Sequence, residues 1–383
     1  MKNQLLQGKK IGFIANTAWS MYNFRLGVMK MLASYGAEIY VVAPYDDYAD
    51  KFAAFSIQFK PLTCLNAKGT NPLGDYLLYR ELRQILKIIR PDFLFTYTIK
   101  PNIYGLLATK SLQIPTIAVI TGLGHGLAKK GILSAVIKMF YRFALKHSVK
   151  TWFLNNDDLT FFIKNNILTE QKTLLLSGEG VDIEYFRRFV PYPDDKTVKF
   201  LYTGRFLYEK GVEDFVKAIE QLKQRGLQVE GELLGFANVL NPSAIKIETI
   251  RLWESKQIIR YLGATDDVRP YLENTNCLVF PSYYNEGMPR CLLEAASMEV
   301  PAITTNTIGC REVVKDGETG YLTEPKDVSS LVAKMEAFVR LPLVYKKEMG
   351  KNARKKVEKD FSEVKILAVY LEQLIKVMHV TSS

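Results

Sequence analysis

The chain has 383 residues, of which 48% are hydrophobic and 24% are charged, and its formal net charge is +11. This composition excludes a disordered chain, and the length exceeds one ordinary hydrophobic core, which predicts two domains. Apolar runs are too short for a transmembrane helix and residues 1–10 are too polar for a signal peptide, so we expect a cytoplasmic protein.

The positive charge is concentrated in the first half of the chain. Residues 1–190 hold 24 Lys and Arg against 13 Asp and Glu, whereas the remaining residues hold 27 of each. Such an excess is suited to an anionic partner, either nucleic acid or a membrane surface. Solubility alone is the alternative, although it does not explain the uneven division.

The first half alternates apolar strand-like runs with helical patterns. Residues 10–15 predict a buried strand, followed by a polar loop, Asn16–Ser20, and a helix that runs to Gly36. Further strands are predicted at 38–43, 57–61, 92–97, 116–121, 151–154 and 174–176, and further helices at 74–89, 103–112 and 132–147. This alternation predicts a parallel sheet covered by helices on both faces.

His125 lies in the glycine-rich loop 122–126, directly after a predicted strand. Glycines there allow the backbone to approach a ligand closely. A lone histidine is more often structural, but a loop at the carboxyl end of a strand is a common place for function. Both interpretations of His125 remain open from the residues alone.

The predicted helix in residues 132–150 has two contrasting sides. Lys138, Arg142, Lys146 and Lys150 recur at four-residue intervals, and no acidic residue occurs between Lys129 and Lys150. The other side carries Ile132, Val136, Met139, Phe140 and Phe143. This pattern is typical of a helix that rests on an anionic bilayer. The alternative is a core helix with a solvated outer face.

Residues 187–195, with two prolines and a cluster of charges, interrupt the alternation and are interpreted as a linker. We therefore predict domains at 1–187 and 188–383, with the option that the final helix packs back on the first domain. In the second half, strands are predicted at 199–203, 230–234, 258–262, 277–280 and 302–305, with helices at 212–224, 244–254, after Asp266 and from Arg290. Two doubly wound halves would face each other across a cleft between their sheet edges.

The second half opens with a strand whose end leads into Gly204-Arg205 and then Lys210-Gly211 before a helix. An arginine fork and a lysine point charge suit a diphosphate leaving group, which gains negative charge as its bond breaks. The alternative is a pair of solvated loop cations, with Lys210 bound to Glu213 or Asp214.

A second stretch, residues 281–299, follows the apolar run 277–280. Glu286 lies in a turn just before a helix, Pro289 suits the first helical position, and Glu294 lies on the helix itself. A helix N-terminus at this place attracts a phosphate, and ionised carboxylates accept hydrogen bonds from sugar hydroxyls. The alternative for Glu294 is a surface ion pair with Arg290, one turn away.

Metal-ligand patterns are missing from the sequence. The chain has no D-x-D triplet, and Asp46-Asp47 and Asp266-Asp267 are interpreted as helix-capping or first-turn acids. The four cysteines are scattered, which predicts buried thiols in a reducing compartment. We therefore expect neither a metal nor another cofactor, and expect protein cations to neutralise a diphosphate.

Taken together, these residues resemble the retaining glycosyltransferases of family 4, which have the two-domain GT-B fold. The resemblance covers nearly the whole chain and is strongest at Gly204–Gly211 and at residues 281–321. In the first half, Thr98–Asn102, Thr121–Gly124 and Gly178–Asp182 are similar to the branch that builds bacterial capsules, O-antigens and undecaprenyl-linked oligosaccharides.

The resemblance implies a nucleotide-sugar donor bound by the second domain. Arg205 and Lys210 would contact the diphosphate, Glu286 the donor sugar near the reacting carbon, and Glu294 the ribose. The remaining nucleotide-site residues would be Gly287, Met288, Arg290, Cys291 and Gly263, in part through N–H groups. His125 and the loop Asn16–Ser20 would face acceptor and donor sugar from the first domain, and the departing phosphate would take the acceptor's proton during front-side transfer.

The sequence departs from the family pattern at three places. The loop Asn16–Ser20 lacks paired glycines, Pro289 removes one N–H from the helix N-terminus, and residues 235–238 do not identify the base, although uridine donors are the common case.

The leading hypothesis is a glycosyltransferase that is peripheral on the inner face of the bacterial cytoplasmic membrane. It would move a hexose or N-acetylhexosamine from a nucleotide diphosphate sugar, with UDP expected, to an undecaprenyl-linked or other glycan acceptor of lipopolysaccharide, capsule or O-antigen biosynthesis. The alternative is a nucleotide-sugar epimerase of similar fold, which would not need a basic membrane face. Nucleic acid is not an expected partner, because no recognised binding module is present.

Overall fold

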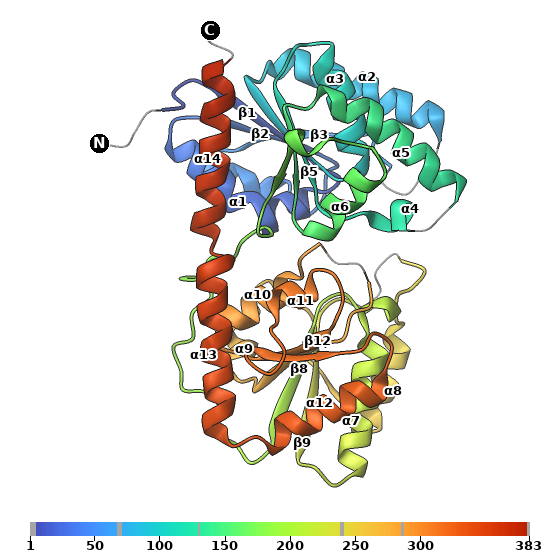
Figure 1. The fold of residues 1–383 in the computed structure, drawn as a ribbon, viewed down its shortest axis with the longest axis vertical. Coiled ribbons are helices and arrows are strands. Elements are labelled where there is room, and N and C mark those ends of the chain that lie inside the picture. Colours follow the sequence, from blue (N-terminus) through green and yellow to red (C-terminus); the bar gives the residue numbers. More distant parts are fainter. Residues whose placement is uncertain (1–4, 67–70, 129–130, 238–240, 285–286, 381–383) are drawn as a thin grey trace. The chain divides into compact units, whose positions relative to one another are not determined.

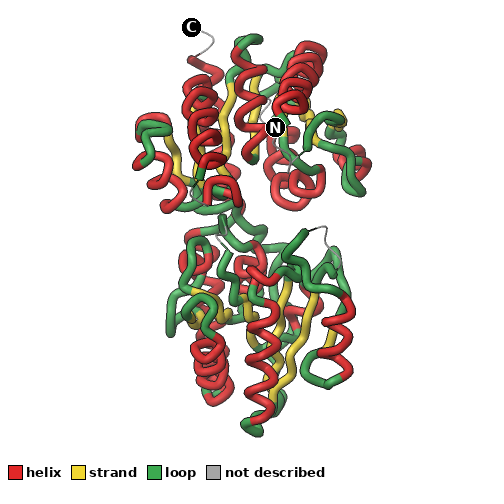
Figure 2. The backbone as a smooth tube through the Cα atoms, turned by 90° about the vertical axis from the view of Figure 1, so that its right-hand side faces the viewer, coloured by secondary structure: helices red, strands yellow, loops and turns green. Residues whose placement is uncertain are grey.

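The computed structural model describes residues 5–66, 71–128, 131–237, 241–284 and 287–380. The chain divides into two compact units (Figure 1): the first unit is Met1–Glu179 with Glu363–Ser383, and the second unit is Gly180–Ser362. In each unit the strands lie together between helices (Figure 2). This is the two-domain arrangement of parallel sheets that the sequence predicts.

The first unit is built on a seven-stranded parallel sheet with the order β3-β2-β1-β4-β5-β6-β7. Its strands are β1 Lys10–Ile14, β2 Glu38–Ala43, β3 Gln58–Pro61, β4 Phe93–Tyr97, β5 Thr116–Ile120, β6 Lys150–Phe153 and β7 Thr173–Leu175. Its α-helices are α1 Ala18–Ser34, α2 Pro72–Ile89, α3 Leu106–Lys110, α4 Gly124–Ala128, α5 Ile132–Ala144, α6 Asn156–Lys164 and α14 Glu363–Val380. Shorter helical turns are η1 Asp50–Phe55, the π-helix η2 Pro101–Gly105, η3 Leu145–His147 and η4 Glu170–Lys172.

Alternate residues of these strands enter different hydrophobic layers, as the two-residue period of a strand requires. Phe13 and Phe95 pack with residues of α1 and α14 on one face. Ile14 and Leu94 pack with α2 on the other face, where Ile120 contacts the layer of α5 and α6. The apolar runs of the first half are therefore central strands that are buried on both sides.

The second unit has a six-stranded parallel sheet with the order β10-β9-β8-β11-β12-β13. Its strands are β8 Val198–Thr203, β9 Val229–Leu234, β10 Arg260–Tyr261, β11 Cys277–Phe280, β12 Ala302–Thr305 and β13 Gly320–Thr323. Its helices are η5 Tyr208–Lys210, α7 Val212–Gln224, α8 Ile247–Ser255, α9 Arg269–Glu273, α10 Arg290–Ser297, α11 Cys310–Val313, α12 Val328–Arg340 and α13 Leu343–Asp360.

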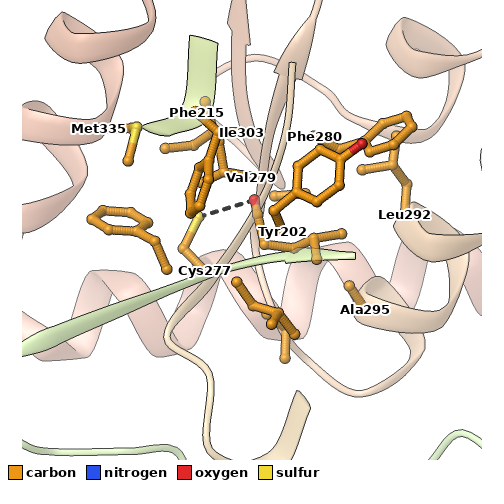
Figure 3. Packing of buried hydrophobic residues seen from close by; sticks show 14 of the residues in the cluster. Tyr202, Phe215, Cys277, Val279, Phe280, Leu292, Ala295, Ile303 and Met335 are labelled. Carbon is orange, nitrogen blue, oxygen red and sulfur yellow. Dashed lines mark hydrogen bonds between the residues drawn. The ribbon is translucent and has the colours of Figure 1, made fainter. Parts of the chain in front are cut away.

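The core of the second unit surrounds β11 (Figure 3). Tyr202, Phe215 and Phe280 form a cluster in which the Tyr202 ring centroid lies 6.0 and 5.9 Å from the other two. Cys277 is fully buried, and burial raises the pKa of its thiol well above the usual value. The expected buried thiols are found at Cys277 and Cys310, while Cys64 and Cys291 are only partly buried.

The division between the units differs from the predicted boundary at 187. Val181 pairs with Ser362, and its N–H donates to the Phe361 carbonyl at 2.9 Å, so the segment after Glu179 already belongs to the second unit. The final helix α14 packs on the first unit, where Tyr370 is buried against Trp152. The linker 187–195 has no helix or strand, but Arg188 donates to the carbonyl oxygens of Leu272, Glu273 and Met298.

Two predicted element boundaries in the first unit are wrong for identifiable reasons. The predicted loop Asn16–Ser20 is shorter, because α1 begins at Ala18. The start of the helix is capped by two hydrogen bonds: the Thr17 hydroxyl accepts one from the Ser20 N–H, and the Asp46 carboxylate accepts one from the Trp19 N–H. The basic helix does not extend to Lys150, which instead opens β6 and is registered with Ile117 of β5.

Other differences concern short elements. The helix predicted at 103–112 begins as the π-helix η2 and ends at Lys110, and His125 lies in the short helix α4 rather than in a loop. Helix α6 and strand β13 were not predicted at all. Among the described residues, no helix combines the length and apolar character needed to cross a membrane.

The core of the first unit contains a buried ion pair between Arg25 of α1 and Glu179. The Arg25 side chain is 3% exposed and its guanidinium lies 4.7 Å from the ring centroid of Tyr97. Burial disfavours the charged form of Arg25, but Glu179 reverses this effect and the pKa of the guanidinium is raised. The Tyr97 hydroxyl is 3.0 Å from the Tyr370 hydroxyl of α14, so three elements meet at this pair.

Replacing Arg25 by Met should destabilise the first unit by about 3 kcal/mol, because Glu179 would remain buried without its countercharge. Urea-dependent hydrogen exchange in β1 and β4 would measure the change. As a control, Lys9→Met removes the exposed pair with Asp92 and should cost less than about 1 kcal/mol. Equal stability of the two variants would contradict the role assigned to the buried pair.

Candidate active site

The two stretches that the sequence indicates as a binding site follow neighbouring strands of the second unit. The strand order reverses between β8 and β11, and in an open parallel sheet ligands bind outside the carboxyl ends of the strands at such a reversal. Residues 204–211 follow β8 and residues 281–289 follow β11. The fold therefore brings together the two stretches that were predicted to bind a diphosphate and a sugar.

The loop after β8 carries the two predicted phosphate ligands. Arg205 is exposed, and Lys210 is partly buried with its Nζ 5.3 Å from the ring centroid of Phe280, the last residue of β11. The loop closes with η5, after which Gly211 adopts a φ of +73° and precedes α7. Both cations are thus held at the carboxyl edge of the sheet.

A single carbonyl oxygen joins the loops after β8 and β11. The Glu209 carbonyl accepts hydrogen bonds from the Tyr283 N–H at 3.0 Å, the Tyr284 N–H at 3.1 Å and the Ser282 hydroxyl at 3.4 Å. Gly211 approaches so closely that a Cβ on it would lie 2.2 Å from the Pro281 carbonyl oxygen. The position of the Arg205–Lys210 loop therefore depends on backbone contacts with the segment that leads to Glu286.

Three glycines line the same edge across β8, β9 and β10. The Gly204 N–H donates to Leu234, the Gly235 N–H donates to the Gly263 carbonyl at 2.8 Å, and a Cβ on Gly235 would lie 1.8 Å from the Gly204 oxygen. Gly263, a predicted nucleotide-site residue, has a φ of +78° and open space where a Cβ would be. A ligand can approach such a surface at backbone distance.

Helix α10 holds the second carboxylate. Arg290 Nε donates to Glu294 Oε1 at 2.9 Å, so the ion pair considered as an alternative is present, but both side chains are largely buried. Burial raises the pKa of Glu294, the charge of Arg290 opposes this effect, and Asp267 adds to it. A poorly solvated carboxylate of this kind has a strong tendency to accept hydrogen bonds from hydroxyl groups.

The other predicted nucleotide-site residues lie at the start of α10. Met288 and Cys291 are partly buried and pack on the core of the second unit. Gly287 precedes them, and Pro289 occupies the N-cap position of α10 without a side-chain cap. The side chains of Met288 and Cys291 therefore contribute to the packing of this segment on the core.

Two predicted catalytic residues cannot be placed. Glu286 lies outside the described residues, although Tyr284 and Gly287 on either side of it are described. The backbone of His125 belongs to α4, but its side chain lies outside the described part of the structure. Their roles therefore stay predictions from the sequence.

At the corresponding edge of the first unit, the order reverses between β1 and β4. Thr98, which follows β4, has a φ of +70°, and its hydroxyl is buried without a hydrogen-bond partner in the described part of the chain. A β-branched residue in this conformation is strained, and strain of this kind is concentrated at functional sites. The adjacent π-helix η2 is a second local irregularity that is frequent at such sites.

Polar residues that were not predicted from the sequence support the β11 loop. The Thr304 hydroxyl donates to the Phe280 carbonyl at 2.7 Å, and the Thr305 and Thr307 hydroxyls donate to the Ser282 carbonyl. These threonines end β12 or follow it, which places them at the same sheet edge. Their position at the end of a predicted strand was the available signal.

Two models of known protein families match the chain, one in each half. The model of glycosyl transferases group 1 matches residues 185–356, which contain both loops, and a glycosyl transferase 4-like model matches residues 10–155. The chain is a glycosyltransferase whose second half matches the group 1 model. Its first unit is of the family 4-like type that the sequence motifs predict.

Curated relatives of this glycosyltransferase are similar over most of their length. N,N'-diacetylbacillosaminyl-diphospho-undecaprenol alpha-1,3-N-acetylgalactosaminyltransferase of Campylobacter jejuni is 27% identical, and the match covers 85% of this chain and 88% of the relative. UDP-Gal:alpha-D-GlcNAc-diphosphoundecaprenol alpha-1,3-galactosyltransferase of Escherichia coli is 26% identical, with 87% of each chain covered. The capsular polysaccharide glycosyltransferase CapM of Staphylococcus aureus is 26% identical, over 75% of this chain and 79% of its own.

Solved structures share the fold of this glycosyltransferase. A glycosyltransferase from Rickettsia africae superposes with a TM-score of 0.80 at 20% identity and covers 97% of this chain and 98% of its own. Anabaena HepE in complex with UDP and glucose gives 0.74 at 17% identity, with 96% and 99% covered. These likenesses confirm the GT-B fold.

In this glycosyltransferase the arrangement at the second unit is suited to binding a diphosphate. Arg205 and Lys210 supply positive charge, the N-terminus of α10 supplies backbone N–H groups, and Glu294 supplies an acceptor. Within the described residues, no group of three or more His, Cys, Asp and Glu side chains is placed to hold a metal ion.

Replacing Gly211 by Ala should destabilise the second unit by about 2 kcal/mol more than Gly226→Ala does. Both glycines have similar φ values, +73° and +77°, so each variant carries the same backbone strain. Only the methyl group at residue 211 would meet the Pro281 carbonyl, while residue 226 is in open space. Urea unfolding, monitored by amide hydrogen exchange of Tyr283 and Tyr284, would measure the difference. Equal losses of stability in the two variants would show that the two loops are not interlocked.

Proposed function

We propose that this glycosyltransferase moves a hexose or N-acetylhexosamine from a nucleotide diphosphate sugar, with UDP as the expected nucleotide, to an undecaprenyl diphosphate-linked saccharide. The observation that carries the proposal is the junction of the β8 and β11 loops through the Glu209 carbonyl, because it joins the loop of Arg205 and Lys210 to residues 282–284, which precede Glu286 in the chain. The printed activities of the Campylobacter and Escherichia relatives support this acceptor class, and the UDP complex of HepE supports the nucleotide.

The donor would bind with its diphosphate on Arg205 and Lys210 and with its ribose hydroxyls on Glu294. As the bond between the anomeric carbon and the diphosphate breaks, the leaving group gains negative charge, which the two cations stabilise. N–H groups at the start of α10 add to this stabilisation. The proposed site therefore lowers the barrier mainly by electrostatic stabilisation of the leaving group.

Glu286 would hold hydroxyl groups of the donor sugar close to the reacting carbon, and His125 would face the acceptor. We propose transfer with retention of configuration, in which the acceptor hydroxyl approaches from the side of the departing diphosphate. The phosphate oxygen that leaves the anomeric carbon then takes the proton of the acceptor hydroxyl, while the new glycosidic bond forms between the acceptor oxygen and the anomeric carbon. The protein cations would perform the role of a metal, so we propose a metal-independent reaction.

Replacing Glu286 by Ala should abolish sugar transfer and preserve nucleotide binding, because the lost carboxylate is proposed to contact the sugar and not the nucleotide. Transfer rates and titration calorimetry with UDP would separate the two effects. Glu324→Ala, which removes an exposed carboxylate of the same unit, is the control and should keep normal transfer. Full activity of the Glu286 variant would remove this residue from the mechanism.

We also propose that the enzyme is peripheral on the inner face of the cytoplasmic membrane through α5. This helix exposes Ile132, Met139 and Phe143 to 87%, 57% and 53%, and Leu133, Val136 and Phe140 are also exposed. An apolar face of this size beside basic residues favours insertion into the headgroup region of an anionic bilayer.

The basic residues of α5 also have internal roles. Lys138 Nζ donates to Asn165 at 2.8 Å, and Arg142 donates to the carbonyl oxygens of Asn165 and Asn166. Charge reversal at these positions would therefore disturb the packing of α5 beside α6. The exposed apolar residues offer a cleaner test of membrane binding.

Replacing Met139 by Glu should reduce binding to liposomes that contain anionic lipid by about tenfold or more, because a charge would enter the apolar face. Sedimentation with liposomes measures this effect. Ile88→Glu on α2, where Ile88 is 79% exposed, introduces the same charge on another helix and should leave binding nearly unchanged. Equal binding by the wild type and the Met139 variant would contradict the membrane proposal.

A further inference from the structure

The first unit contains a cavity of about 580 Å³ at the amino ends of β5 and β6. Its walls come from the end of α3, the turn before β5, the segment 147–150 and helix α14. Ligands of the sheet bind at the carboxyl ends of its strands, which is the opposite edge. The proposed transfer reaction therefore gives no account of this cavity.

Positively charged side chains surround the cavity. Lys110, Lys150 and Lys376 line it, together with His147. Lys376 pairs with Glu372, whereas neither Lys110 nor Lys150 has a carboxylate within ion-pair distance among the described residues. An apolar-walled recess with such an excess of cations attracts an anion.

His147 lies in the same positive electrostatic potential. Burial lowers the pKa of its imidazole, and the charges of Lys110, Lys172 and Lys146 lower it further. Its Nε2 atom is buried and has no hydrogen-bond partner within the described ranges. A bound anion would offset the surrounding charge and supply a partner for the protonated ring.

The cavity is amphipathic and continuous with the exposed face of α5. Ile114, Pro115, Val149 and Val377 contribute apolar wall. Phe143 of the exposed α5 face contacts the cavity residues directly: its ring centroid lies 5.7 Å from that of His147 and 5.6 Å from Lys110 Nζ. The apolar surface proposed to enter the bilayer thus leads into the cationic recess.

We propose that this cavity binds the phosphate headgroup of an anionic phospholipid. The phosphate would lie among Lys110, Lys150 and His147, the glycerol backbone along the apolar wall, and the acyl chains beside Phe143. An inorganic phosphate would use the cations but leave the apolar wall and the adjoining α5 face without a role. The proposal rests on the membrane association proposed above and identifies its lipid partner.

The test uses the full chain and the double variant Lys110→Gln/Lys150→Gln. Vesicles of equal parts phosphatidylcholine and phosphatidylglycerol should bind the wild type strongly, and the double variant on the order of tenfold more weakly. The control is Lys87→Gln/Lys164→Gln, which removes the same charge from two exposed lysines of the first unit and should have a much smaller effect. Equal losses in the two double variants would mean diffuse attraction and would overturn the pocket.

A second readout locates the lipid. Water-soluble dihexanoyl phosphatidylglycerol should shift the His147 ring-proton resonance, assigned with His147→Gln, at concentrations where inorganic phosphate has little effect. An equal response to phosphate alone would overturn the assignment to a lipid, and no response to either would overturn the site. Transfer to a water-soluble acceptor should be normal in the Lys110/Lys150 variant, so a failed lipid site and a failed transferase proposal give different results.

Discussion

The buried pair of Arg25 and Glu179 is the contact on which the organisation of this chain depends. Glu179 is the last residue of the first unit before the chain enters the second, and Arg25 lies on α1, which begins at the carboxyl end of β1. The chain re-enters the first unit at Glu363. The Glu363 carboxylate contacts α1 at Gly27, where it fills the space that a Cβ would need. One helix therefore holds both crossing points, and a buried charge without its partner would be costly there.

The second constraint is the reversal of strand order in each parallel sheet. In the second unit it puts the β8 and β11 loops next to each other, and the Glu209 carbonyl then fixes them together. This backbone junction connects the loop that carries Arg205 and Lys210, the proposed diphosphate ligands, to residues 282–284. The chemistry of the proposed transferase is thus a consequence of backbone geometry as much as of charged side chains.

Much of this could be predicted from the sequence, because apolar runs of central strands and helical periodicity are local signals. The helix Val212–Gln224 and the strands Glu38–Ala43 and Cys277–Phe280 follow from such patterns. Contacts between distant segments are not local: the Glu209 junction and the left-handed Thr98 have no sequence signature. The threonines at the end of β12 were marked only by their place at the end of a predicted strand. Residues 16–20 were predicted as a loop because helix caps and loops use the same residue types, although α1 begins at Ala18. Lys150 was assigned to the basic helix because the spacing of basic residues continues past the end of that helix.

The central claim is that this glycosyltransferase joins a sugar from a nucleotide diphosphate donor to an undecaprenyl-linked saccharide. The most direct measurement is to incubate the enzyme with undecaprenyl diphosphate-linked saccharides and a panel of UDP-hexoses and UDP-N-acetylhexosamines, and to analyse lipid and nucleotide products by mass spectrometry. We expect one donor for which the lipid-linked glycan gains a single sugar in step with the UDP released. An altered nucleotide sugar with an unchanged lipid would indicate epimerisation and contradict it.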